Sequence, residues 1–162
     1  MHETTLTYNE VLVRRAVWCY WRRSLGPGYW VALAMVFSSF LVLQSQGTEA
    51  WIRIVLVAAL AVALGFAALL FFVHYRASMG RFRRMDAPLA RFIADDERFA
   101  FSSTVGAASL KWSVVKELWR FEDLWLLLYR EGGFNVLPLA CLPPPMRDFL
   151  VQRVEAVGGR VR

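Results

Sequence analysis

Histidine and acidic side chains are the first places to look for chemistry in this sequence, because they bind metals and transfer protons. The two histidines, His2 and His74, have no Cys, Asp or Glu at metal-ligand spacing. Three adjacent acids at 95–97 alternate faces along a strand and lack the spacing of a calcium loop. A solvated turn is the better interpretation of these acids, and a membrane-interface position is the better interpretation of His74. The sequence therefore predicts no metal site.

Motifs for nucleophilic catalysis and phosphate binding are also missing from the sequence. Gly26-Pro27-Gly28 predicts a turn rather than a phosphate-binding loop, and no nucleophile elbow occurs. Cys19 and Cys141 lie far apart, so we expect free thiols, with acylation of Cys19 as the weaker alternative. The sequence thus predicts no catalytic residues, no cofactor and no enzyme activity.

An aromatic and basic segment near residues 111–125 is the best candidate for binding a partner. Aromatic rings interleaved with basic residues are typical of single-strand nucleic-acid binders. Here Glu117, Glu122 and Asp123 interrupt the basic field, so we predict no nucleic-acid partner. A sheet core with some rings left exposed is the favoured alternative. Four residues are the candidate partner contacts: Trp112, Trp119, Arg120 and Trp125.

The elements that hold these residues follow from the distribution of apolar side chains. Hydrophobic residues make up 57% of the 162 residues, and the mean hydropathy is +0.40. They concentrate between Tyr29 and Tyr75 rather than spreading over many short elements, which favours membrane spans. The net charge of +6 fits an anionic membrane surface, because the arginines cluster beside the apolar segments.

A transmembrane helical hairpin is predicted over 29–75. The first span needs residues 25–46 to reach the roughly 20 residues of a bilayer crossing, and the second runs from Trp51 to Tyr75. A buried hairpin in a soluble protein is the alternative, but the uncharged run from Ile54 to Val73 argues against it.

The N-terminal segment 1–28 is predicted to be a short strand followed by a helix on the cytoplasmic side. Arg14, Arg15, Arg22 and Arg23 fall within one half of a helical wheel, as in a helix that lies on the membrane. Val11, Leu12 and Trp18 share that side, so a plain helical lead-in to the first span stays equally open.

Arginines on both flanks of the hairpin predict its orientation. The link between the spans contains no Lys or Arg, so the positive-inside rule places both termini in the cytoplasm. Segment 76–91 is expected to be a basic connector, which either sets the topology alone or also attracts anionic lipid. The membrane-surface and topology residues are Arg14, Arg15, Arg22, Arg23, Arg76, Arg81, Arg83 and Arg84.

Residues 92–162 are predicted to form a small cytoplasmic β domain. Alternating or apolar segments predict strands at 98–102, 109–113, 124–129 and 134–137, while 114–121 is ambiguous between strand and helix. Pro143-Pro144-Pro145 stops the sheet and opens a helix from about Met146 to Val157. The expected fold class is an α+β membrane protein with a transmembrane hairpin, an antiparallel β domain and a C-terminal capping helix.

This order of elements, together with Leu110-x-Trp112-x-x-Val115 and a strand that ends at Pro138, resembles the YcxB-like family. The resemblance is clearest from Phe92 to Val157. The sequence departs from the family pattern at Glu97, where Gly is usual, and at Leu139, where a basic residue is common.

The resemblance implies a two-span protein of the bacterial inner membrane with a C-terminal domain of the bacterial pleckstrin-homology (PH-like) type. It implies architecture more than activity. We therefore expect a non-enzymatic interaction module that presents its domain to a protein partner, a second copy of itself or inner-leaflet lipid. The alternative is a membrane-resident immunity or regulatory protein that neutralises a toxin or restrains a membrane partner. A lipid-modifying enzyme is the least favoured hypothesis.

Overall fold

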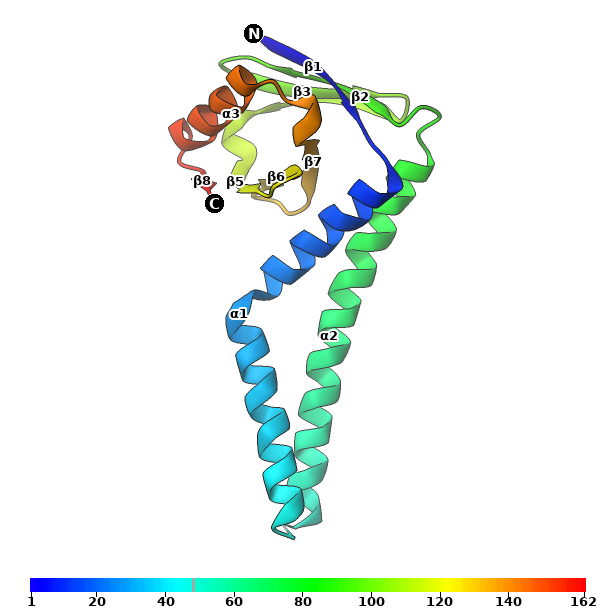
Figure 1. Cartoon of the computed structure of the whole chain (residues 1–162), viewed down its shortest axis with the longest axis vertical. Helices are drawn as coiled ribbons and strands as arrows, with labels where there is room; N and C mark the ends of the chain where they lie inside the picture. Colours follow the sequence, from blue (N-terminus) through cyan, green and yellow to red (C-terminus); the bar gives the residue numbers. More distant parts are fainter. Residues whose placement is uncertain (48) are drawn as a thin grey trace. The chain divides into compact units, whose positions relative to one another are not determined.

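The computed structural model describes residues 1–47 and 49–162 (Figure 1). Thr48, in the predicted link between the spans, lies outside the described residues. The chain divides into two compact units. One consists of Met1–Ala16 with Ser78–Arg162, and we call it the β unit. The other is Val17–Ala77, which we call the hairpin unit.

Two long helices run through the hairpin unit: α1, Glu10–Ser45, and α2, Ala50–Arg83. Helix α1 is two helices joined at a kink, because Gly26 has φ 70° and ψ 166°, outside the helical region. Pro27 follows, and a proline is well tolerated in the first turn of a helix. The stretch from Pro27 to Ser45 is about 28 Å long at 1.5 Å per residue, which matches a hydrocarbon core.

Two long-range hydrogen bonds join α1 to α2 within the hairpin unit. The Trp21 indole donates to the Ala67 carbonyl oxygen at 2.7 Å, and the Tyr29 hydroxyl donates to the Ala63 carbonyl oxygen at 2.6 Å. Both acceptors belong to alanines, whose small side chains let a facing helix come close. These contacts hold the two helices as a hairpin.

Most apolar side chains of this hairpin are exposed. In the most apolar 18-residue window of α1 none of the residues is buried, and in that of α2 only 6% are. The mean hydropathies of these windows are 1.6 and 2.9. A core helix of a soluble protein would instead bury its apolar side chains. Two long, apolar and largely unburied helices therefore suggest a membrane protein.

The β unit contains two four-stranded sheets. The first has the order β1-β2-β3-β4 and is antiparallel throughout. The second has the order β7-β6-β5-β8, in which β8 runs parallel to β5. The strands of the first sheet are β1 His2–Thr7, β2 Leu89–Ala94, β3 Arg98–Ser103 and β4 Gly106–Lys111. Those of the second are β5 Val115–Arg120, β6 Leu124–Tyr129, β7 Phe134–Pro138 and β8 Arg160–Val161.

Helix α3, Pro144–Ala156, completes the core of the β unit. Pro144 and Pro145 occupy its first positions, where a backbone N–H would have no helical carbonyl oxygen to bond, so the missing N–H groups cost no hydrogen bond. Met146, Leu150 and Val154 share one face and are buried in the same cluster as Phe99 and Leu127 from the two sheets. Short 3₁₀ turns, Trp112–Val114 and Leu139–Cys141, follow β4 and β7. Figure 1 shows α3 beside β5 within this unit.

The predicted fold class is confirmed: two long apolar helices form a hairpin, and β-sheets and a C-terminal helix follow. The segment boundaries differ from those expected from the sequence. Strand β1 does not belong to a separate N-terminal segment 1–28, because it pairs with β2 from Thr7↔Leu89 to His2↔Ala94. The local sequence of His2–Thr7 could not predict this pairing, because its partner strand lies more than eighty residues away.

The expected connector 76–91 is also corrected. Helix α2 continues to Arg83 and β2 begins at Leu89, so the irregular link is limited to 84–88. Arginine is a good helix former, and 76–83 contains neither a proline nor a Gly–Pro break that would stop α2 earlier. Pro88 marks the true end of the link. The β unit accordingly starts earlier than the predicted domain 92–162.

Candidate functional site

The structure places Trp112 in the core rather than on a contact surface. Trp112 is 2% exposed, and its ring centroid lies 4.8 Å from that of Phe99. Its indole N–H donates to the Asp95 carbonyl oxygen at 2.8 Å. The Asp95 carboxylate in turn accepts the backbone N–H groups of Arg98 and Glu97, and these two bonds lower its pKa. Trp112 therefore ties the β2–β3 turn to the core.

Trp119 and Trp125 are buried as well, on opposite faces of the second sheet. Trp125 belongs to the core cluster between the sheets and is 7% exposed. Trp119 is 6% exposed, and its indole donates to a carboxylate oxygen of Glu117 at 2.6 Å. Glu117 is itself buried and lies 3.6 Å from the Arg162 guanidinium. The indole and the guanidinium stabilise a carboxylate that would otherwise be costly to bury.

Their burial agrees with the interpretation of this segment as a sheet core and argues against these three tryptophans as exposed partner contacts. A sheet pair of this size needs large side chains to fill its core, and the tryptophans supply them. Only Arg120, of the four predicted contacts, is exposed. Its backbone N–H donates to the Arg162 carbonyl oxygen, so the residue also fixes β8 against β5.

The predicted membrane-surface arginines keep their charged groups at or near the surface. Seven of the eight are exposed, and Arg23 is half-buried. Arg15 pairs with Asp123 at 2.9 Å, which fixes the first turns of α1 to the β5–β6 turn of the β unit. Arg14 lies 3.9 Å from Glu10 on the same helix, an exposed pair of small value.

The side chains that could bind a metal do not come together. Within residues 1–47 and 49–162, no three His, Cys, Asp or Glu side chains are grouped to hold a metal ion. Cys19 and Cys141 form no disulfide bond within the described residues. The Cys141 sulfur accepts the backbone N–H of Thr7 at 3.3 Å, a contact that ties β1 to the end of the second sheet.

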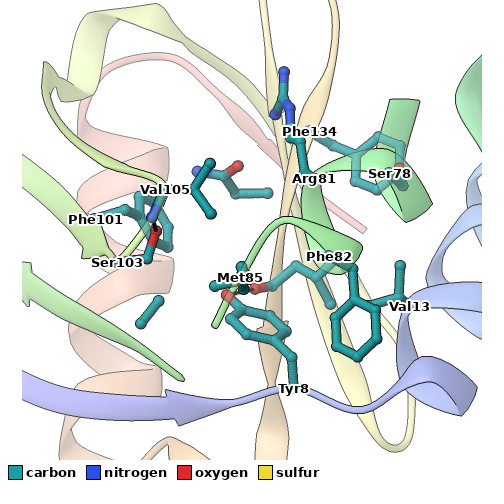
Figure 2. Close-up of a pocket in the computed structure, with 13 residues that line it drawn as sticks. Tyr8, Val13, Ser78, Arg81, Phe82, Met85, Phe101, Ser103, Val105 and Phe134 are labelled. Carbon is teal, nitrogen blue, oxygen red and sulfur yellow. Dashed lines mark hydrogen bonds between the residues drawn. The ribbon is translucent and has the colours of Figure 1, made fainter. Parts of the chain in front are cut away.

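A pocket of about 200 Å³ in the β unit is the candidate site (Figure 2). It lies where the first sheet and β7 meet the last turns of α2, and it is partly open to the surface. Phe82 of α2, Phe101 of β3 and Phe134 of β7 are among its apolar walls. The polar lining residues are Tyr8, Ser78, Arg81, Ser103 and Asn135.

Arg81 is the only charged residue among the 13 that line the pocket. None of the ion pairs formed by the described residues includes Arg81, so no carboxylate neutralises it. An arginine beside apolar walls offers a positive charge and up to five N–H donors. The pocket therefore combines apolar walls with one cationic side chain among its lining residues.

Two partly buried tyrosines of the β unit, Tyr8, which lines the pocket, and Tyr129, which does not, have raised pKa values. The Tyr8 hydroxyl donates to the Val136 carbonyl oxygen at 2.9 Å. The Tyr129 hydroxyl is buried and has no hydrogen-bond partner among the described residues. Burial raises the pKa of both tyrosines, while the Arg81 charge is close enough to Tyr129 to oppose that rise. Both hydroxyls are therefore neutral at physiological pH and can act as donors.

Sequence patterns could not reveal this pocket. Its lining residues come from six parts of the chain between Tyr8 and Val136, and none forms a motif with a neighbour in sequence. In the sequence, Arg81 stands out only as one of several arginines that set topology. No family model matches the chain, no curated protein is similar enough to match it, and no solved structure matches it.

Proposed function

We propose that this protein is a membrane-anchored, non-enzymatic interaction module. In this proposal the hairpin unit crosses the bacterial inner membrane twice, and the β unit and both termini lie in the cytoplasm. The β unit binds inner-leaflet lipid or a protein partner, which includes a second copy of the chain. The resemblance to the YcxB-like family, with its PH-like domain, belongs to the same proposal.

The observation that carries the proposal is the pair of long apolar helices whose side chains are almost entirely unburied within the chain. In water such a surface would drive aggregation, whereas in lipid it costs nothing. Arginines flank the hairpin in sequence, before its first span and after its second, and the link from Gln44 to Glu49 has none. That charge difference supports a cytoplasmic β unit.

Thiol labelling in intact cells tests this topology. We start from a chain with Cys19→Ser and Cys141→Ser, and then add one cysteine at an exposed position. Glu131→Cys places it in the β6–β7 turn, and Gln46→Cys places it in the link between the helices. A membrane-impermeant maleimide should label Gln46→Cys in intact spheroplasts and Glu131→Cys only after the membrane is permeabilised, because a charged reagent cannot cross the bilayer.

Each cysteine variant is the control for the other, since both sites are exposed and differ only in the side of the membrane. Labelling of Glu131→Cys in intact spheroplasts would contradict the cytoplasmic position of the β unit. Equal labelling of both sites without permeabilisation would contradict the two-span anchor.

A further inference from the structure

The pocket beside Arg81 is the feature of the β unit that the anchor alone does not explain. The pocket has a volume of about 200 Å³ and is partly open to the surface. An apolar cavity of about 150 Å³ is large enough to hold benzene. This pocket can therefore take a short alkyl segment, but two complete acyl chains would not fit.

The positive charge of Arg81 favours apolar ligands that carry an anionic group over neutral ones. Arg81 lines it, and no lining residue is acidic. A guanidinium pairs best with a carboxylate or a phosphate, where its N–H groups bond two oxygens at once. The neighbouring Ser78 and Asn135 are uncharged hydrogen-bonding side chains that can share in holding such a head group.

The position of Arg81 in the sequence places the pocket close to the end of the second predicted span. Arg81 belongs to α2 and follows Val73, the end of the uncharged run, by only eight residues. If the hairpin spans the bilayer, this connection keeps the pocket near the inner leaflet, where anionic amphiphiles are concentrated. The inference rests on the proposed function to that extent.

We propose that the pocket lined by Phe82, Phe101, Phe134 and Arg81 binds a single-chain amphiphilic anion. Its alkyl segment lies among the three phenylalanine rings, and its carboxylate or phosphate pairs with Arg81. The amphiphile comes either from the leaflet, as a single-chain phospholipid, or from solution, as a free acyl carboxylate. The interaction is non-covalent binding, without a chemical step.

Photo-crosslinking of the full-length protein in native membranes tests this proposal. The probes are decanoate that carries a diazirine in its chain, the matching decanol, and a lysophosphatidylglycerol with the same diazirine chain. Labelled peptides are identified by mass spectrometry. We expect label from decanoate or from lysophosphatidylglycerol in the peptides that contain Phe101 and Phe134, with decanol about tenfold weaker.

Arg81→Gln should lower pocket labelling by about tenfold, equal to about 1.4 kcal/mol. Arg84→Gln is the matched control, because Arg84 is an exposed arginine on the same segment that does not line the pocket. Val105→Trp should also reduce labelling by filling the mouth of the pocket. Val105 is 45% exposed, so the larger side chain has room without disturbing the core.

Labelling by decanoate alone identifies a soluble acyl anion as the source, and labelling by lysophosphatidylglycerol identifies the leaflet. Equal labelling by decanol, or equal loss in the Arg81→Gln and Arg84→Gln variants, overturns the inference. If either of these two results is found while labelling of Glu131→Cys still requires permeabilisation, the pocket proposal fails and the proposed function stands. A β unit on the opposite side of the membrane would contradict the proposed function, even with Arg81-dependent labelling.

Discussion

Leu64→Arg should prevent stable insertion of the hairpin into the membrane. Leu64 is 55% exposed and lies near the middle of the uncharged run 54–73 of α2. An arginine at the centre of a transmembrane helix costs about 2.5–3.5 kcal/mol on insertion scales, and the loss of the leucine adds to this. The equilibrium constant for insertion of α2 should therefore fall by about a hundredfold, and the fraction of protein that resists alkaline extraction from membranes should fall with it.

Leu64→Ala is the matched control for this experiment, because it removes the same side chain without adding a charge. It should stay in the membrane fraction. An arginine variant that resists extraction as well as the alanine variant would show that position 64 faces neither lipid nor an apolar protein interior.

Trp112→Ala should strongly destabilise the β unit. The substitution empties a site that is 2% exposed and removes the indole donor to the Asp95 carbonyl oxygen. Large-to-small changes of a buried tryptophan cost about 3–5 kcal/mol. Pulse proteolysis of the full-length protein in nanodiscs, across a urea series, should show the β unit cleaved at much lower urea.

Arg120→Ala is the comparison, since Arg120 belongs to the same predicted contact segment as Trp112 but is exposed. An exposed substitution of this kind changes the free energy of unfolding by about 0.5 kcal/mol or less. Two variants with the same urea midpoint would contradict the assignment of Trp112 to the core.

The hairpin could be predicted from the sequence because its signal is local. A run of uncharged residues such as 54–73 favours a membrane span over a buried helix of a soluble protein, and the kink at Gly26 falls at the Gly26-Pro27-Gly28 turn. The strand at 124–129 and the helix that opens after Pro143 are also confirmed, since apolar runs and prolines mark element boundaries directly.

Long-range features could not be predicted in the same way. The pairing of β1 with β2 joins residues more than eighty positions apart, and nothing in His2–Thr7 marks its partner. The sequence could not show which tryptophans are exposed, because Trp119 and Trp125 alternate with polar residues only in part. Their burial on both faces of the second sheet depends on what covers each face. The pocket required six separate segments to meet.

The contact of the hairpin with lipid is the central claim, and oxygen accessibility at position 64 tests it most directly. A nitroxide is attached to Leu64→Cys in the chain that lacks Cys19 and Cys141, and the protein is reconstituted in bilayers. Because oxygen concentrates in hydrocarbon while a nickel chelate stays in water, relaxation should be fast with oxygen and unaffected by nickel. Relaxation that responds to nickel, or to neither reagent, would contradict a lipid-facing helix.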